Sequence, residues 1–202
     1  MKVWIAWSGK TSQEVAAILK SWLVTMNPHI EAFFSSKNIA PGTNWIEELH
    51  RNVFECDCAL FCLTSDNIHS PWLYYEAGVL HNTKNIIPVL FDVPAYQLDG
   101  PFIQFQALTF EKENLWKIVN FLNGLCGQDA VPAKELRGKF ETLYPTVEKM
   151  LALVRDSQQE RLQENQSGQS AGDNFATLNS KLDAILSRLP NPVPSPRQEN
   201  SL

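Results

Sequence analysis

One ionisable carboxylate, that of Glu76, lies in an unusually apolar and aromatic run over residues 70–78. Ser70 is suited to cap a helix and the proline after it suits the first turn, so the sequence predicts a helix over residues 71–82. Two interpretations of Glu76 stay open on this pattern. It is either a boundary carboxylate paired with a basic residue from elsewhere, or a partly desolvated group placed for chemistry.

The spacing within this helix places Glu76 near a buried stripe. Leu73, Ala77 and Leu80 fall at i, i+4 and i+7, which predicts one apolar face. Trp72 and Glu76 are four residues apart and therefore share a face beside that stripe. We expect the indole to form a wall of any site around the carboxylate.

Composition excludes several classes of protein. The 202 residues suffice for one domain plus an appendage, and a hydrophobic content of 44% suffices for a core. A net charge of -5 with a pI near 5.4 argues against a nucleic-acid partner. No apolar run approaches the length of a membrane span, and the first residues are strand-like rather than a signal peptide, so we expect a soluble, cytoplasmic protein.

The cysteines and histidines predict neither disulfides nor a metal site. Cys56, Cys58 and Cys62 lie in or beside one apolar run, and Cys126 ends a distant helical pattern, so no disulfide framework is evident. The four histidines lack the spacing of zinc ligands.

Strand and helix patterns alternate along the first 126 residues. Strands are predicted over 2–7, 29–36, 57–64, 85–91 and 106–110, with helical periodicity between them. This alternation is typical of an α/β, flavodoxin-like, doubly wound parallel sheet of about five strands. The loops 8–11, 35–43 and 65–70 all follow strands, so they should meet at the carboxyl edge, beside the start of the Glu76 helix.

A helical extension follows this part of the chain. Residues 132–156 predict a helix that Pro145 kinks or splits, and the polar residues 157–173 read as a flexible linker. A short amphipathic helix is predicted over 174–189, and 190–202 as a disordered tail. The apolar seam of the helix 174–189 is too short for a stable coiled coil alone, and docks either on the domain or on another copy. The seam consists of Phe175, Leu178, Leu182, Ile185 and Leu189.

Common catalytic motifs are absent. Gly9-Lys10-Thr11 follows the first strand, but a phosphate-binding loop needs a glycine at the position that Trp4 occupies. No GxGxxG, GxSxG, kinase or HExxH pattern occurs either.

Three segments carry a resemblance to a known family. The first strand ending in Ser8-Gly9, the loop 36–42 followed by Trp45, and the run 70–76 resemble a TIR (Toll/interleukin receptor homology) domain of the prokaryotic branch. Trp72 and Glu76 match the family's Trp-x-x-x-Glu pattern, and residues 36–43 match its long loop after the second strand. The resemblance covers about residues 1–126. Many members carry an acidic residue in that loop where this chain has Lys37-Asn38.

The resemblance implies cleavage of the nicotinamide–ribose bond of NAD+, with Glu76 as the catalytic carboxylate. Glycosidases normally use two carboxylates, but nicotinamide leaves as a neutral ring from a pyridinium and needs no acid, so one suffices. Trp72 either supports that carboxylate or only packs in the core. Ser8, Gly9, Ser36 and Trp45 are candidate substrate contacts; for each of Ser8, Ser36 and Trp45, a cap or core role stays open. NAD+ is then the substrate, so no cofactor and no metal are expected.

Similarity to short bacterial members further implies antiphage defence, in which NAD+ is depleted or converted to a cyclic ADP-ribose isomer. We expect self-association through TIR faces, helped by the helix at Phe175–Leu189, and an upstream sensor or downstream effector protein. Two alternatives stay open. One is a non-catalytic TIR adaptor, and the other is an enzyme resembling nucleoside deoxyribosyltransferases.

Overall fold

The computed structural model describes residues 1–34, 55–81 and 85–186, with side chains up to residue 163. The chain divides into two compact units, Met1–Asp156 and Ser157–Leu202.

A parallel sheet forms the centre of the first unit. Its strands in the described residues are β1 (Lys2–Ala6), β2 (Glu31–Phe34), β3 (Cys58–Leu63), β4 (Asn85–Leu90) and β5 (Leu108–Thr109). They pair in the order β2-β1-β3-β4-β5, and every pairing is parallel. Successive residues alternate between two apolar clusters, one on each face. The predicted doubly wound sheet is therefore confirmed.

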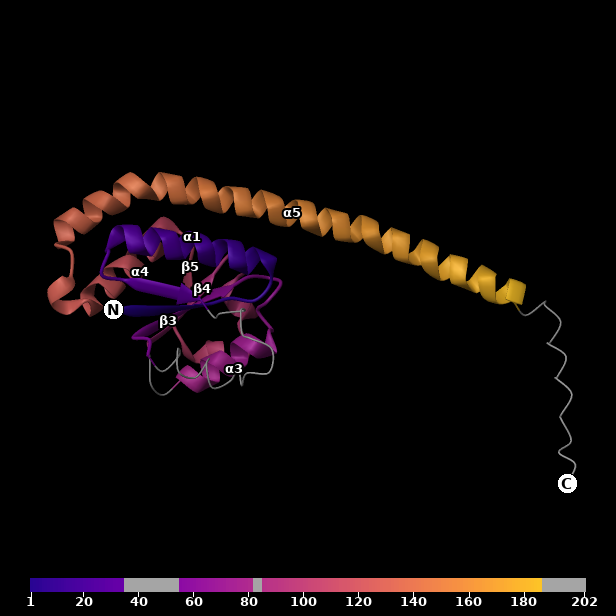
Figure 1. Ribbon diagram of the computed structural model, residues 1–202, viewed down its shortest axis with the longest axis horizontal. Helices are drawn as coiled ribbons and strands as arrows, with labels where there is room; N and C mark the ends of the chain where they lie inside the picture. The colour runs from indigo at the N-terminus through magenta and orange to yellow at the C-terminus, as the bar shows by residue number, and fades with distance from the viewer. Residues whose placement is uncertain (35–54, 82–84, 187–202) are drawn as a thin grey trace, which may run out of the picture. The chain divides into compact units, whose positions relative to one another are not determined.

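Helices cover both faces of this sheet (Figure 1). Helix α1 (Lys10–Met26) and helix α4 (Lys112–Leu125) pack on one face, and helix α3 (Pro71–Leu80) packs on the other. Helices α1 and α3 each join two parallel strands, as right-handed crossovers require, and α4 follows the last strand, β5.

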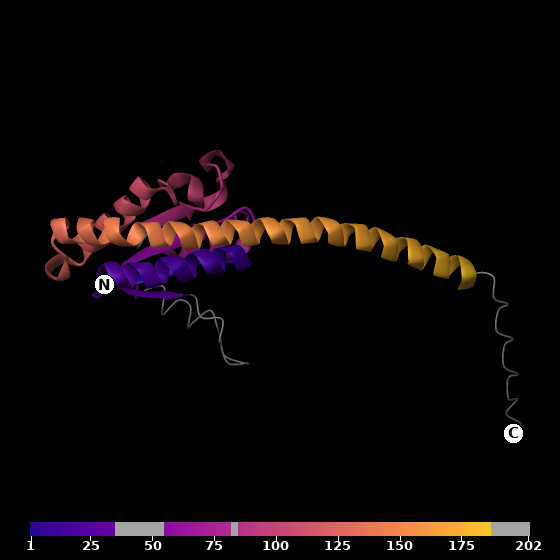
Figure 2. The same cartoon turned by 90° about the horizontal axis from the view of Figure 1, so that it is seen from above.

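The first part of α5 (Ala133–Leu186) belongs to the same core. Figure 2 shows this part, up to residue 156, lying over α1 and α4. Phe140 is fully buried there, with its ring 5.7 Å from Trp22 of α1 and 5.2 Å from Trp116 of α4. At the end of the unit, Arg155 Nε donates to both carboxylate oxygens of Asp92, at 2.9 and 2.8 Å.

Of the two forms expected at Pro145, a kinked helix or a split one, the split does not occur, because α5 is continuous. The expectation of a flexible linker was wrong, because residues 157–173 are helical. Proline removes only one backbone hydrogen bond, and buried Phe140 and Val147 hold the helix on both sides of it. The supposed linker contains no proline, and its Gln, Glu, Arg and Ala residues favour helix, which outweighs its two glycines. The expected helix 174–189 forms the last turns of α5 as far as Leu186, and the expected tail lies outside the described residues.

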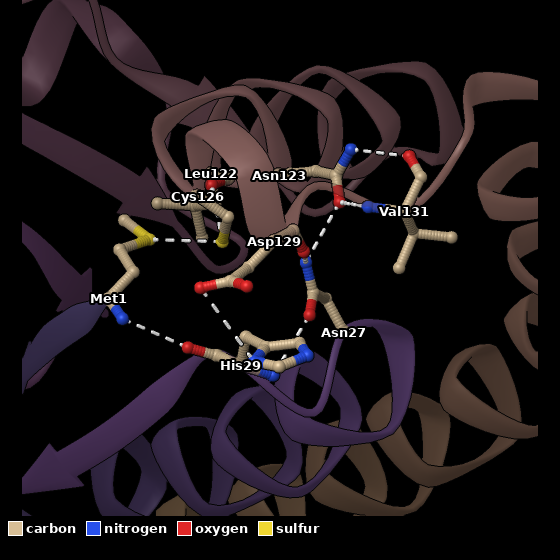
Figure 3. Close-up of polar contacts among 8 residues, drawn as sticks. All are labelled: Met1, Asn27, His29, Leu122, Asn123, Cys126, Asp129 and Val131. Atoms are coloured by element: carbon tan, nitrogen blue, oxygen red, sulfur yellow. Dashed lines mark hydrogen bonds and ion pairs between the residues drawn. The ribbon is translucent and has the colours of Figure 1, made fainter.

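A network of neutral amides closes the amino edge of the sheet (Figure 3). Asn27 Nδ2 donates to Asn123 Oδ1 at 2.9 Å and to the Asp129 carbonyl at 3.2 Å. The Asn123 side chain also brackets Val131, accepting from its N–H and donating to its carbonyl, both at 2.9 Å. These bonds tie the ends of α1 and α4 to the segment that leads into α5. No helix in the part of the chain that the structure describes is long and apolar enough to span a membrane.

Candidate functional site

The carboxyl ends of β1 and β3 are the natural place for a ligand. The strand order reverses between these two strands, and open parallel sheets bind ligands at such a switch point. Residues 7–9 follow β1 and residues 64–70 follow β3, so two of the three predicted loops meet at this edge. The third, 35–43, lies outside the described residues.

Asn67 joins these two loops. Its Nδ2 donates to the carbonyls of Ser8 and Cys62, each at 3.0 Å, and its Oδ1 accepts from the Thr64 N–H at 2.7 Å. The side chain is only 3% exposed. One buried amide therefore sets the spacing between the ends of β1 and β3.

The first turn of α1 is tied to the same loop. Thr11 Oγ1 donates to Asp66 Oδ2 at 3.0 Å, and Ser12 Oγ donates to the Cys62 carbonyl at 2.7 Å. The N-cap position belongs to Gly9, whose φ of 86° is a conformation that glycine adopts readily. A Cβ at this position would be strained, and no side chain caps the helix.

Glu76 lies in the middle of α3 and is fully buried. Its exposed fraction is 0%, and it belongs to the same buried face as Leu73, Ala77 and Leu80. We expected it beside that stripe, but the structure places it within the stripe. Among the residues whose side chains the structure describes, Glu76 is the only Asp, Glu, Lys or Arg that is buried. Burial of a carboxylate costs several kcal/mol before its interactions are counted, so a fully buried acid is a candidate for a chemical role.

Trp72 lies on the same helix and is half-buried. Its indole stacks on the ring of Tyr75, with centroids 5.8 Å apart, and packs at the border of the cluster beneath α3. It therefore borders the apolar surroundings of Glu76 on the side toward the start of α3.

The other predicted site residues divide into two groups. Ser8 is half-buried and its carbonyl holds Asn67, while Gly9 starts α1, so both lie at the switch point. Ser36 and Trp45 lie outside the described residues. The carboxyl edge thus brings together Ser8, Gly9 and the start of the helix that carries Trp72 and Glu76.

Sequence reasoning missed Asn67, Thr11 and Ser12. The sequence places Asn67 in a turn, and an asparagine in a turn often bonds the backbone of that turn. That signal could have identified its bond to Thr64, but not its bond to Ser8, which lies 59 residues away.

A further cavity of about 280 Å³ lies at the carboxyl ends of β4 and β5 and is lined in part by Asp92, Glu111 and Arg155. Asp92 has a φ of 54°, which is unusual for a residue other than glycine.

Burial raises the pKa of the Cys58 thiol to about 12 and that of the Cys62 thiol further, so both thiols stay protonated and unreactive. Within the described residues, no cluster of His, Cys, Asp and Glu could hold a metal ion.

Comparison with known proteins gives one family match. The model of the TIR domain family matches residues 3–119. Among curated proteins, no match to the chain is found. Among solved structures, the chain is similar to the TIR domains of the activated Roq1 resistosome, which directly recognises the pathogen effector XopQ. The identity is 16% and the TM-score 0.40, over 77% of this chain and 98% of that chain. It is also similar to an azoreductase from Bacillus anthracis str. Sterne, at 9% identity and a TM-score of 0.37 over the same shares.

Proposed function

The chain belongs to the TIR domain family, and on that premise we propose that it is an NAD+ nucleosidase of the prokaryotic type, with Glu76 as the catalytic carboxylate. The observation that carries the proposal is the burial of Glu76 on α3, the helix that follows the switch-point strand β3. Perturbed, buried acids are concentrated at functional sites, which supports this assignment.

The chemistry needs one negative charge beside the ribose. As the bond from C1′ to nicotinamide breaks, the electron pair leaves with the neutral ring and positive charge develops on the sugar. A carboxylate held in a site without water stabilises that charge by several kcal/mol, and it accepts hydrogen bonds from the ribose hydroxyls. Water or the adenine ring then attacks C1′, giving ADP-ribose or a cyclic isomer. Both carboxylate oxygens are covered in this structure, so substrate must displace the covering atoms.

Trp72, Ser8 and Gly9 support this site in the proposal. Trp72 limits the positions open to the Glu76 side chain, and the loop at Ser8 and Gly9 borders the space above the switch point. Ser36 and Trp45 are proposed as further contacts.

Turnover of NAD+ tests the proposal directly. Concentrated protein is incubated with NAD+, and nicotinamide, ADP-ribose and its cyclic isomers are separated by chromatography. We expect wild type to release nicotinamide and Glu76→Gln to lose at least about 1000-fold in rate, because the isosteric amide keeps the shape without the charge. Glu31→Gln, the same change at an exposed carboxylate at the amino end of β2, is the matched control and should retain full activity. Equal turnover by wild type and Glu76→Gln would remove Glu76 from the reaction, and a wild type without turnover at any concentration would favour an adaptor.

We also propose that self-association activates the protein in a bacterial cytoplasm, as part of antiphage defence with a sensor or effector partner. Residues 175–186 of the predicted seam are helical in α5, which is what an association helix requires. A chain that ends after Arg155 keeps nearly the whole first unit. It should form smaller oligomers by light scattering and turn over NAD+ more slowly at equal concentration. Unaltered size and rate would show that the second unit plays no part in association.

A further inference from the structure

Helix α3 has little stability of its own. It contains only 10 residues, has Gly78 in its second half, and makes no side-chain cap bond at Ser70. Isolated helices of this length do not hold together in water, so contacts with neighbouring segments must hold α3 in place.

The segment between β4 and β5 supplies such contacts through Tyr74. The Tyr74 hydroxyl donates to Asp99 Oδ1, and His69 Nδ1 lies 2.9 Å from Asp99 Oδ2. Phe102, fully buried in the 3-10 turn Gly100–Gln104, packs edge-on against the Tyr74 ring at 5.8 Å. The same Phe102 ring lies 5.1 Å from Phe61 of β3, so this segment bridges the helix and the sheet.

Gly100 allows the aromatic ring to come this close. A Cβ at Gly100 would lie 3.0 Å from Tyr74 Cζ, and its φ of +55° is one that glycine favours. The pKa of Tyr74 is raised to about 12, first by burial and then by its bond to Asp99, so the hydroxyl remains a donor at any physiological pH. Ring and hydroxyl are thus both engaged by the same short segment.

We propose that Tyr74, held by Asp99 and Gly100, is a positioning residue that sets the place of Glu76 through helix α3. Tyr74 and Glu76 are two residues apart, which is about 200° around a helix of 3.6 residues per turn. Tyr74 therefore acts from the side of α3 away from the carboxylate and does not touch the reacting atoms. A displacement of about 1 Å at a reacting group can cost about 100-fold in rate, so a modest shift of α3 is enough to affect turnover.

This proposal rests on the proposed function, and a kinetic split tests it. Tyr74→Phe keeps the ring and removes the hydroxyl, and Gly100→Ala pushes the ring away. We expect kcat per folded molecule to fall about 10-fold in each, with KM changed less than about twofold, because the effect is on geometry rather than on substrate binding. Asp99→Asn keeps an acceptor for the Tyr74 hydroxyl, so this variant should retain most of the wild-type kcat. Tyr96→Phe is the matched control, because Tyr96 lies in the same segment between β4 and β5 but is 84% exposed. It should leave kcat unchanged.

Hydrogen exchange separates this proposal from the proposed function. Measured on protein without NAD+, the backbone amides of α3 should exchange about 5- to 10-fold faster in Tyr74→Phe than in wild type and in Tyr96→Phe. If the protein does not cleave NAD+, faster exchange confined to α3 still supports the positioning role, and only the enzyme assignment fails. Unchanged exchange in α3, or an unchanged kcat in an active enzyme, would overturn the role of Tyr74.

Discussion

The two edges of the sheet are both tied by buried asparagines, but among the described residues only the helix that starts at the carboxyl edge carries a buried acid. At the amino edge, Asn27 and Asn123 bond one another and nearby carbonyls, so the buried polar side chains of this network are neutral amides (Figure 3). At the carboxyl edge, Asn67 joins the ends of β1 and β3 in the same manner. Helix α3, which starts at this edge, also carries the fully buried Glu76.

This difference separates structure from chemistry within one molecule. An amide whose donors and acceptors are all paired is buried at little net cost, whereas a carboxylate is not. The amino edge shows how the chain joins helices and strands when only stability matters. By that standard, Glu76 is the residue at the carboxyl edge that calls for a functional explanation.

The largest expected effect that would test this comparison is on stability. Asn123→Ala removes three hydrogen bonds and leaves the Asn27 amide and the Val131 backbone with fewer partners. We expect the free energy of unfolding to fall by about 3 kcal/mol in urea titrations, because each buried unpaired group costs about 1–3 kcal/mol. Turnover of NAD+ per folded molecule should stay at the wild-type value.

Asn120→Ala is the matched control, since Asn120 is exposed on the same helix α4. Its free energy of unfolding should change by less than about 0.5 kcal/mol. A drop in turnover per folded molecule in Asn123→Ala would show that the amino edge is not purely structural.

A smaller effect on stability, combined with an effect on activity, is expected at the other edge. Asn67→Ala removes the bonds to Ser8, Cys62 and Thr64, and should lower the free energy of unfolding by about 2 kcal/mol. Because Ser8 and the loop after β3 border the proposed site, turnover per folded molecule should fall as well. Ser65→Ala, on the exposed part of the same turn, should change neither quantity. Loss of stability with full turnover would mean that the Ser8 loop does not contribute to the site.

The sheet was predictable because its signal is local. Strands β1, β3 and β4 are continuous apolar runs, as buried parallel strands must be, and each was located to within one residue at either end. The edge strand β5 has only two residues, Leu108–Thr109, where five were expected, because an edge strand has fewer partners and its pattern is weaker.

The errors arise where distant residues decide the local structure. Local sequence gives no sign that the Thr11 hydroxyl bonds Asp66, 55 residues away. Asn67 likewise contacts Ser8 from far along the chain. For Glu76, helical spacing predicted the correct helix, but its depth depends on how α3 is rotated on the sheet, which helical spacing alone does not determine.

The smallest expected effect uses pH to distinguish the carboxyl-edge contact of Tyr74 from the amide network. The folded-state pKa of Tyr74 is about 12, above its ordinary value near 10, so its contribution to stability is complete below pH 10. That contribution is lost as the pH rises from 10 to 12, where the unfolded chain releases the proton more readily. The difference in unfolding free energy between wild type and Tyr74→Phe, about 1 kcal/mol at pH 8, should therefore shrink across that interval. Other groups that titrate there are common to both proteins and cancel in the difference.

Amides do not ionise, so the difference in unfolding free energy between wild type and Asn123→Ala should stay constant from pH 8 to pH 12 in the same urea titrations. A Tyr74 difference that also stays constant would mean that packing of the ring, rather than its hydroxyl bond to Asp99, holds α3.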